Sequence, residues 1–363
     1  MKILIVMTTS ENVINFRMCL IKKLLALGHE VIVFANDDKR SQEIIETGAV
    51  FQKIVNNNRS INVIKTLRYQ RTLRKAMAQM KPDIVFTFQA KPNAFGAKAA
   101  HQAGVKRIFS MVEGAGDSFC NKGLKWKLVK KVLIHLYKKS LKYSEKVFFL
   151  NNDDVEEFSR LKIVKANQAA IIDGIGVDLE RFAYQPLNKD SQQFIMVARM
   201  LPTKGVYTYC KCANLVRKTH PNASFLYLGQ EASIKVSDIQ QYIDNGDIKY
   251  LGSIKDVRED VKGCLALILP SYREGKPVSV MEAEAIGRAI LTTTSIGCKD
   301  TVIDGFNGYR VQLNDYEALA KHCIELLENK DLADTFGKNS RKMAEERFDQ
   351  NKINDEILRY MFG

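Results

Sequence analysis

The sequence lacks the features that mark several broad classes of protein. No apolar run approaches the roughly 18 residues that a membrane-spanning helix needs, so we expect no transmembrane helix. The opening residues MKILIVMTTS hold one lysine and a short apolar run that reaches polar residues at Thr8, which predicts a first strand rather than a signal peptide. The five histidines show no HxxxH or HxH spacing and no DxD motif is evident, so we expect no metal cofactor.

Cysteine is scarce and odd in number, which argues against a disulfide framework. The seven cysteines stand mostly on apolar backgrounds, at positions 19, 120, 210, 212, 264, 298 and 323. The only close pair, Cys210-x-Cys212, has the spacing of neither a zinc site nor a redox CxxC motif. We therefore expect buried free thiols in a reducing cytoplasm.

Acidic residues are in deficit in one half of the chain only. Residues 1–180 hold 30 Lys and Arg against 17 Asp and Glu, whereas residues 181–363 hold 25 against 24. Nearly all of the net charge of +14 therefore lies in the first half. A one-sided basic domain indicates an anionic partner, such as a membrane surface, a nucleic acid or a phosphorylated substrate.

The length of 363 residues suits two domains of about 150–200 residues better than one core. A hydrophobic content of 46% and a charged content of 26% are typical of a globular protein. The turn-rich segment 173–190 is a predicted hinge. We place the domains at 1–180 and 181–345, followed by a C-terminal segment, 346–363, within a long amphipathic helix that begins at Glu345 and crosses back to the first domain.

Both halves alternate short apolar runs, rich in β-branched and aromatic residues, with segments of helical period. Apolar strands between helices predict parallel sheets covered on both faces, and hence two doubly wound α/β domains that face a central cleft. The predicted strands are residues 3–7, 31–35, 83–88, 106–112, 146–150, 194–198, 224–228, 248–251, 265–269 and 289–293. The main helical segments of the first half are 16–27, 61–80 and 126–143.

The stretch SYREGKPVSVME, residues 271–282, sets two glutamates eight positions apart around a Gly-Lys-Pro turn. Glu274 is predicted in the loop after a strand, and Glu282 more than a turn into a helix that Pro277 opens and Gly287 ends. The backbone amides between the two would form an anion site suited to a diphosphate. Two carboxylates first suggest an acid–base pair, but this placement also fits two groups that bind the parts of a ligand on either side of its phosphates. Glu284 should point elsewhere and be solvated.

The E-x7-E spacing, with the preceding apolar strand, Pro270-Ser271 and the trailing DGFNGYRV, resembles the GT-B glycosyltransferases of family 4. The resemblance covers essentially the whole chain. It implies a GT-B fold and a retaining, metal-independent transferase whose donor is a UDP-sugar. It also implies that Glu274 binds the transferred sugar and Glu282 the ribose. The diphosphate would lie against the residues between them, Gly275, Lys276, Pro277 and Val278.

Two further segments agree with this resemblance. MVARMLPTKGV (196–206) is similar to the family's strand and basic loop, in which an Arg and a Lys, here Arg199 and Lys204, grip the donor diphosphate. Two cations there would stabilise the leaving nucleotide, so we assign them with Glu274 as catalytic. Ordinary surface charge is the alternative. LYLGQ and YLGSI resemble the turns that cradle diphosphate and base, which adds Gly229 and Ile254 to the donor-binding residues.

A narrower resemblance lies in the first half, in INFRM, KPNAFGAKAA, MVEGAGDSF and LVKKVLIHLYKKSLKY. These segments look like the subgroup that adds N-acetylgalactosamine to undecaprenyl-diphosphate-linked N,N'-diacetylbacillosamine, in α-1,3 linkage, during bacterial protein N-glycosylation. The resemblance implies neighbouring glycosyltransferases of that pathway as partners. It also implies acceptor-binding residues, with Arg17 and Lys91 at the diphosphate and Glu113, Gly114, Gly116 and Asp117 at the sugar. A plain turn is the alternative for the last four.

One segment departs from the family. Many members carry two glycines in the first strand–helix loop, which give backbone amides to the donor phosphate. The corresponding loop here, TTSENVINF (8–16), has none. We therefore expect little phosphate contact from the first domain and a larger share for Arg199 and Lys204.

Residues 122–142 hold eight lysines interleaved with apolar side chains. The opening, NKGLKWKLVKK, places the chain's only tryptophan among lysines, which suits contact with an anionic lipid interface. The alternative is a core-packed helix with a solvated basic face. We hypothesise peripheral, monotopic contact of residues 119–131 with the cytoplasmic face of the inner membrane. The foremost residues are Lys122, Lys125, Trp126 and Lys127.

Rival functions remain at this point. The nearest is another family-4 transferase with a different UDP-sugar or lipid-linked acceptor, as in O-antigen or capsule synthesis. A nucleotide-sugar epimerase of the same architecture would not need a basic first domain. A pI near 9.3 also fits a nucleic-acid-binding protein. However, we find no recognition motif or aromatic stacking platform, and expect no nucleic acid partner.

Overall fold

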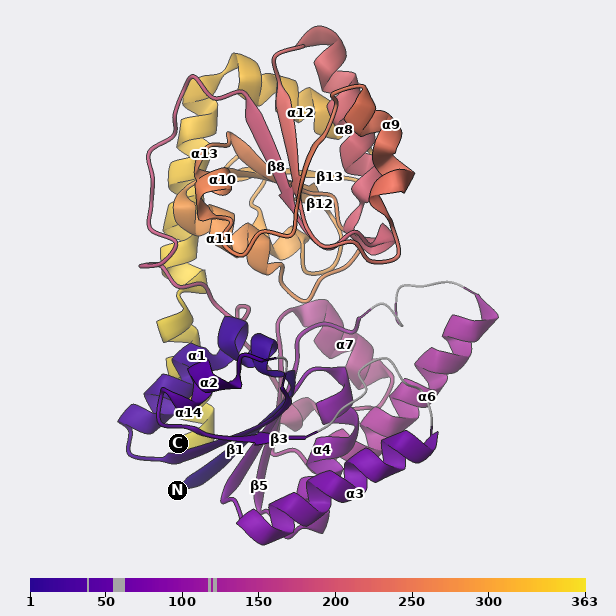
Figure 1. Ribbon diagram of the computed structural model, residues 1–363, viewed down its shortest axis with the longest axis vertical. Coiled ribbons are helices and arrows are strands. Elements are labelled where there is room, and N and C mark those ends of the chain that lie inside the picture. The colour runs from indigo at the N-terminus through magenta and orange to yellow at the C-terminus, as the bar shows by residue number, and fades with distance from the viewer. Residues whose placement is uncertain (38, 55–62, 117–118, 120–122) are drawn as a thin grey trace. The chain divides into compact units, whose positions relative to one another are not determined.

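The computed structural model describes residues 1–37, 39–54, 63–116, 119 and 123–363, without the side chains of residues 63–67 and 125 (Figure 1). Asp117 and Lys122 therefore lie outside the described residues, as does the side chain of Lys125. The chain divides into two compact units. Unit 1 comprises residues 1–172 and 354–363, and unit 2 comprises residues 173–353.

The described part of unit 1 holds a seven-stranded parallel sheet in the order β3-β2-β1-β4-β5-β6-β7. Its strands are β1 (Lys2–Thr9), β2 (Glu30–Asn36), β3 (Val50–Lys53), β4 (Ile84–Phe88), β5 (Arg107–Val112), β6 (Lys146–Phe149) and β7 (Ala169–Ile171). Every residue of β4 is buried, as expected of a strand covered on both faces. The strand order reverses beside β1, and open α/β sheets bind ligands at the carboxyl ends next to such a reversal.

Helices cover both faces of this sheet. Figure 1 shows α1 and α2 on one face, whereas α3, α4 and α6 lie side by side over the other. The described helices of unit 1, apart from the C-terminal helix, are α1 (Ser10–Ala26), α2 (Ser41–Ile45), α3 (Val63–Met80), α4 (Ala90–Gln102), α6 (Leu124–Leu141), α7 (Asn152–Arg160) and the 3-10 turn η1 (Ala166–Gln168).

The described part of unit 2 repeats the plan with a six-stranded parallel sheet, in the order β10-β9-β8-β11-β12-β13. Its strands are β8 (Gln193–Val197), β9 (Ser224–Leu228), β10 (Lys249–Gly252), β11 (Ala266–Leu269), β12 (Ala289–Thr293) and β13 (Gly308–Val311). The order reverses between β8 and β11, which pair through Ala266 and Phe194. The carboxyl ends of these two strands are therefore where this unit should bind a ligand.

The helices of unit 2 lie between successive strands up to β13, and the last two follow that strand. They are η2 (Pro202–Lys204), α8 (Val206–Thr219), η3 (Val236–Ile239), α9 (Gln240–Asp244), α10 (Arg258–Lys262), α11 (Val278–Ile286), η4 (Lys299–Thr301), α12 (Tyr316–Glu328) and α13 (Lys330–Met343). The chain ends with a π-helical turn η5 (Ala344–Phe348) and α14 (Gln350–Phe362). The two doubly wound α/β domains predicted from the sequence are confirmed.

Two expectations about strands and loops need correction. The ten predicted strands are present, but the short strands β3, β7 and β13 were missed. They have only three or four residues each, too few for a clear periodicity. The predicted loop TTSENVINF is wrong, because β1 runs to Thr9 and α1 begins at Ser10. The Thr9 side chain accepts a hydrogen bond from the Asn12 amide at 3.2 Å, a helix cap that needs no glycine.

The C-terminal helix is also interrupted, where one continuous helix was expected. The Val177 amide donates to the Phe348 carbonyl at 2.7 Å, and the Gln350 amide donates to the Val177 carbonyl at 3.1 Å. These bonds replace helical ones on either side of Asp349, whose backbone is extended. Beyond this break α14 joins unit 1, where Arg107 donates to the Met361 carbonyl at 2.5 Å.

Candidate functional site

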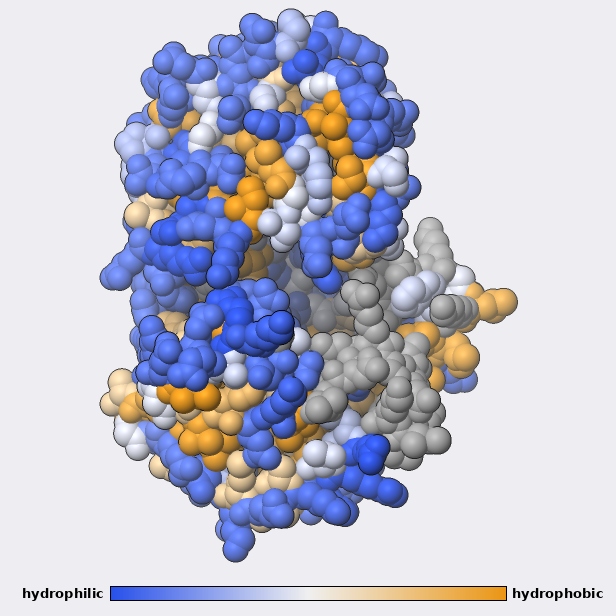
Figure 2. Space-filling model, in the orientation of Figure 1, coloured by the Kyte–Doolittle hydropathy of each residue, from blue (hydrophilic) through white to orange (hydrophobic). Residues whose placement is uncertain are grey.

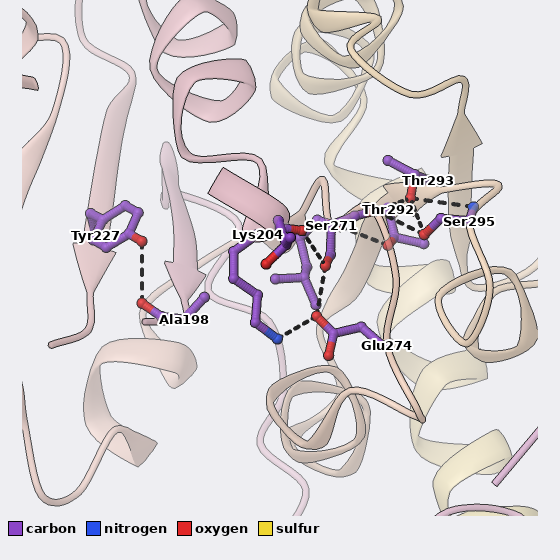
Figure 3. A network of polar contacts seen from close by, with 10 residues as sticks. Ala198, Lys204, Tyr227, Ser271, Glu274, Thr292, Thr293 and Ser295 are labelled. Atoms are coloured by element: carbon purple, nitrogen blue, oxygen red, sulfur yellow. Dashed lines mark hydrogen bonds and ion pairs between the residues drawn. The ribbon is translucent and has the colours of Figure 1, made fainter. Parts of the chain in front are cut away.

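The carboxyl ends of β8 and β11 bring a lysine and a glutamate together in unit 2 (Figure 3). Lys204 Nζ lies 2.5 Å from Glu274 Oε1, and the Ser271 hydroxyl donates to the same oxygen at 2.7 Å. The side chains of Lys204 and Glu274 keep 21% and 12% of their surface exposed. The pair is thus sheltered, but a ligand can still reach it.

Hydroxyl groups at the end of β12 hold the backbone of the loop that carries Glu274. Thr293 and Ser295 both donate to the carbonyl of Ser271, at 2.6 and 2.7 Å, as Figure 3 shows. Both residues are buried. The Glu274 amide donates to the Ile296 carbonyl at 2.9 Å. The sequence prediction missed these hydroxyl groups, although the run TTTS at 292–295 could have indicated them. Hydroxyl groups at the end of a buried strand commonly find backbone carbonyls as hydrogen-bond partners.

Close backbone approaches fix the two glycine-bearing turns of the site. A side chain on Gly297 would come within 2.4 Å of the Glu274 carbonyl oxygen, and one on Gly229 within 1.7 Å of the Ala198 carbonyl oxygen. The Tyr227 hydroxyl also donates to the Ala198 carbonyl, at 3.2 Å (Figure 3). Glycine at both positions therefore lets neighbouring loops close against the ends of β8 and β11.

The loop after Glu274 leads directly into α11. Pro277 is the residue before the first helical one, so the predicted helix start is one residue early, while Gly287 ends the helix in the left-handed conformation as predicted. The start of α11 therefore points its amide groups toward this loop. No acidic side chain occupies the first turn of α11. The arrangement favours a bound anion between Glu274 and the helix.

The side chain of Lys276 turns away into the unit and is buried there. Its ammonium group binds Asp173, which also accepts from Arg347 Nε and Nη2 at 2.7 and 3.0 Å. Burial opposes ionisation of Asp173, but the hydrogen bonds from Arg347 and Lys276 prevail and lower its pKa. Asp173 and Arg347 were not predicted. They anchor the loop that carries Glu274.

Glu282 lies on the second turn of α11 and is half-buried. Burial raises its pKa to about 7, against a lowering by Arg181, while Asp256 contributes a smaller rise. A carboxyl group that titrates near neutral pH is poised to change charge when a ligand binds. Arg181 and Asp256 were not predicted as neighbours of this group.

The expectation that Glu284 is solvated is wrong. Its side chain is fully buried, and Asn307 Nδ2 donates to its Oε1 at 3.0 Å. Burial raises the pKa of Glu284 well above its ordinary value, against smaller lowering effects of Arg347 and Lys276. Glu282 and Glu284 are two residues apart on α11, so their side chains point in different directions. The sequence spacing did not show that the side chain of Glu284 points into the core.

The remaining donor-side predictions lie on loops at the same edge of the sheet. Arg199 is exposed directly after β8, and Gly229 follows β9. Ile254, after β10, keeps 38% of its surface exposed. Gly275 and Pro277 are buried, and Val278 is half-buried at the start of α11.

Unit 1 carries its own ion pair at the carboxyl end of β5. Arg17, on α1, is buried, and its Nη2 binds Glu113 while its Nη1 donates to the Phe16 carbonyl at 2.6 Å. The guanidinium carbon lies 4.4 Å from the ring centre of Phe88. Burial raises the pKa of Glu113 in spite of Arg17, and burial lowers the pKa of Arg17. Arg17 and Glu113, which were predicted to bind different parts of the acceptor, therefore form an ion pair with each other.

The other predicted acceptor residues are in the turn after Glu113 and on α4. Gly114 and Gly116, in the turn after β5, have φ values of 125° and 75°, in the region that favours glycine. Lys91 is half-buried in the first turn of α4, with its Nζ 5.5 Å from the ring centre of Tyr69. Burial lowers its pKa. Asp117 is not among the described residues.

Helix α6 exposes a row of large apolar side chains. Leu124, Leu128 and Val132 keep 86%, 64% and 44% of their surface exposed, and their four-residue spacing puts them on one side of the helix. Figure 2 shows hydrophobic residues gathered on α6 at the right edge of the view. Trp126 is half-buried and Lys127 exposed.

Among the described residues, no helix is long and apolar enough to cross a membrane, and no three metal-ligating side chains meet.

Both halves of the chain are similar to known glycosyltransferases. Residues 178–343 match the family described as "Glycosyl transferases group 1", and residues 2–151 match "Glycosyl transferase 4-like". The chain is 28% identical over 361 residues to the N,N'-diacetylbacillosaminyl-diphospho-undecaprenol alpha-1,3-N-acetylgalactosaminyltransferase of Campylobacter jejuni, with 96% of this chain and 95% of that protein covered. It is 27% identical over 317 residues to the UDP-Gal:alpha-D-GlcNAc-diphosphoundecaprenol alpha-1,3-galactosyltransferase of Escherichia coli, covering 82% and 80%.

Solved structures share the fold. Anabaena HepE in complex with UDP and glucose superposes with a TM-score of 0.82 at 16% identity, and 99% of each chain is covered. A sucrose-phosphate synthase from Thermosynechococcus elongatus gives a TM-score of 0.81 at 17% identity, again with 99% of each chain covered. The two family matches together cover most of the chain. The chain belongs to family 4 of the GT-B glycosyltransferases.

Proposed function

We propose that this glycosyltransferase moves N-acetylgalactosamine from UDP-N-acetylgalactosamine to undecaprenyl-diphosphate-linked N,N'-diacetylbacillosamine, with an α-1,3 linkage and retention at the anomeric carbon. The observation that carries the donor half is the Lys204–Glu274 pair beside the start of α11. The acceptor half rests on the similarity to the Campylobacter jejuni enzyme, which extends over nearly all of both chains.

Donor binding would open the Lys204–Glu274 pair. The incoming diphosphate carries more charge than one carboxylate, so it competes for the ammonium group of Lys204. Glu274 keeps its hydrogen bond from Ser271 and gains free acceptor positions for the hydroxyls of the transferred sugar. The side chain of Lys276 stays with Asp173, so its part in donor binding falls to the backbone.

The same residues account for the chemistry. The acceptor hydroxyl attacks the anomeric carbon from the face that the leaving UDP departs from, through an oxocarbenium-like state. The departing β-phosphate oxygen takes the hydroxyl proton, so neither a protein nucleophile nor a general base is required. Lys204, Arg199 and the amides of α11 stabilise the charge that develops on UDP, the work that a metal ion does in other transferases.

The rest of the nucleotide would lie along the loops that follow β9 and β10. Glu282 accepts hydrogen bonds from the ribose hydroxyls, and its ionised form is the stronger acceptor. Gly229 leaves space for close backbone approach, and Ile254 offers an exposed apolar surface to the base. These assignments place the donor entirely on unit 2.

Acceptor binding is assigned to unit 1. Arg17 was predicted to contact the acceptor diphosphate, but it is buried and bound to Glu113. We therefore assign sugar contact to Glu113, beside the open turn of Gly114 and Gly116, and give Arg17 the task of holding that carboxylate. Lys91 remains the candidate for the acceptor diphosphate.

The lipid carrier of such an acceptor requires contact with a membrane, which we assign to α6 at the cytoplasmic face of the inner membrane. Leu124 and Leu128 would enter the interface, and the neighbouring lysines would meet anionic head groups. Replacing both leucines by serine should abolish flotation with anionic liposomes. The control, Leu313→Ser, removes a leucine of unit 2 that keeps 43% of its surface exposed. Unchanged flotation of the α6 variant would refute this surface.

A UDP-release assay tests the substrate assignment. The full-length enzyme is offered UDP-N-acetylgalactosamine, UDP-N-acetylglucosamine, UDP-galactose and UDP-glucose, each with diacetylbacillosamine or N-acetylglucosamine on undecaprenyl diphosphate. The proposal requires UDP-N-acetylgalactosamine with the bacillosamine acceptor to give the fastest release, and NMR of the product to show an α-1,3 linkage. Fastest turnover with any other pair would overturn it.

A second candidate is a transferase of the same family that uses another UDP-sugar or lipid-linked acceptor, as in O-antigen or capsule synthesis. The observation in its favour is the 27% identity to an Escherichia coli enzyme named for galactose transfer to a GlcNAc-diphosphoundecaprenol. The same assay separates the two, since this candidate predicts the fastest release from a donor such as UDP-galactose.

A further inference from the structure

Unit 2 has a hollow lined by three tyrosines, outside the proposed donor site. It measures about 320 Å³ and lies where the start of α8, the start of α12 and the loop after β11 meet. Helices α8 and α12 pack side by side here (Figure 1). The rings belong to Tyr207 on α8, Tyr272 in the loop and Tyr316 on α12.

The polar groups of the hollow are already oriented. The Tyr272 hydroxyl donates to the side-chain oxygen of Asn314, whose backbone has a φ of 65°, a conformation that residues other than glycine rarely adopt. Lys211 Nζ lies 5.4 Å from the ring centre of Tyr316. Tyr207 keeps 44% of its surface exposed. A rim of exposed and half-exposed aromatic rings, with a cation and an amide beside them, is the composition of a small-molecule site.

The size and chemistry of the hollow select among ligands. Its volume is at the lower end of the range for small-molecule sites, which suits one or two sugar rings and not a whole UDP-sugar. None of the described lining residues is acidic, so a cation is disfavoured. Sugar rings present apolar C–H faces to aromatic rings and hydroxyls at their edges. Tyr207 and Tyr316 offer such faces, and Lys211 and Asn314 offer partners for the hydroxyls.

The hollow is nonetheless distinct from the place assigned to the donor. Its wall includes Tyr272, whose amide donates to the Thr203 carbonyl at 2.8 Å and so ties together the two loops that carry Glu274 and Lys204. The side chains of Glu274 and Lys204 meet each other and are not among its lining residues. The two sites therefore share loops but use different side chains.

We propose that this tyrosine-lined hollow is a second saccharide-binding site, separate from the donor site. The inference does not depend on which sugar the enzyme transfers, because no residue of the donor assignment lines the hollow. It predicts that a free sugar binds unit 2 while UDP fills the donor site.

Saturation-transfer NMR on the full-length protein tests this. The probes are N-acetylgalactosamine, galactose and galacturonic acid, each titrated in the presence of saturating UDP. Galacturonic acid shows whether Lys211 favours an acidic sugar. At least one probe should bind, and Tyr207→Ala and Tyr316→Ala should each weaken that binding roughly threefold to tenfold, the loss expected from one aromatic contact. Tyr207→Phe keeps the ring and should retain most of the affinity.

Lys218→Ala serves as the matched control for Lys211→Ala, since Lys218 is exposed two turns further along α8. Only Lys211→Ala should weaken sugar binding. Thermal unfolding of each variant verifies that it is folded. The proposal is overturned if none of the three sugars binds in the presence of UDP, or if binding is unchanged in both tyrosine-to-alanine variants. If UDP itself does not bind, the proposed function fails, whereas tyrosine-dependent sugar binding would persist.

Discussion

Each unit carries an ion pair at the carboxyl ends of its parallel strands, but the two pairs are built in opposite ways. In unit 2 both side chains are partly exposed, and the cation is a lysine at the end of the short 3-10 turn η2. In unit 1 the cation is a guanidinium with 4% of its surface exposed, packed over an aromatic ring. A lysine can leave its partner for a stronger anion, whereas a buried arginine that lost its partner would be a desolvated charge. We infer that the first pair is opened by the donor and the second is permanent.

The largest expected effect on stability tests the permanent pair. Arg17→Met should lower the free energy of unfolding of unit 1 by about 3 kcal/mol. This is the lower end of the range for breaking a buried pair, since Glu113 keeps 20% exposure. Trp126 is the only tryptophan and lies in unit 1, so its fluorescence during urea unfolding reports on that unit. Lys204→Ala should change the stability of unit 2, followed by hydrogen exchange, by about 1 kcal/mol or less.

A double variant sharpens this test. Adding Glu113→Gln to Arg17→Met removes the charge that is left unpaired, so part of the lost stability should return. If Arg17→Met unfolds like the unchanged protein, or the double variant is less stable than the single one, the Arg17–Glu113 pair is not the fixed support inferred here.

The largest expected effect on turnover tests the pair that opens. Lys204→Ala should lower kcat by about 10²–10³, the loss that follows removal of one oriented group from a developing anion. The UDP-release assay with saturating donor and acceptor measures it. Lys218→Ala, an exposed lysine on α8, is the control and should leave kcat unchanged. Normal turnover of the Lys204 variant would refute its catalytic role.

A smaller effect separates the two members of that pair. Glu274→Gln keeps the shape of the side chain but removes the charge that accepts from the sugar hydroxyls. Hydrogen bonds to charged groups contribute about 1.5–3 kcal/mol, so transfer should slow roughly 10–100-fold. UDP alone should bind at least as tightly, because UDP carries no transferred sugar and no longer competes with Glu274 for Lys204. Weakened UDP binding with unchanged kcat would reverse the assignment.

The comparison also shows what a sequence can reveal. Glu274 and Glu282 could be predicted as donor-binding residues because they belong to one local motif, and Arg199 and Lys204 because they belong to another. In each motif a strand, a turn and a helix start lie within a few residues of one another. The Arg17–Glu113 pair joins residues 96 positions apart, and only the sheet brings α1 to the end of β5. Asp173 and Arg347, which hold Lys276, are likewise distant in sequence from it. Burial decided the remaining error, since helix periodicity did not show that Glu284 faces the core.

The smallest predicted effect depends on pH and concerns Glu282. Its pKa is raised to about 7, so in the free enzyme the carboxyl group is largely ionised at pH 8 and largely protonated at pH 6. The ribose hydroxyls donate most strongly to the ionised form. UDP affinity, measured by calorimetry, should therefore fall roughly tenfold when the pH is lowered from 8 to 6. UDP itself also titrates in this range, and Glu282→Gln removes only the contribution of the protein. The variant should therefore bind UDP weakly at both pH values, with a smaller pH dependence. An equal pH dependence in both proteins would mean that Glu282 does not bind the ribose.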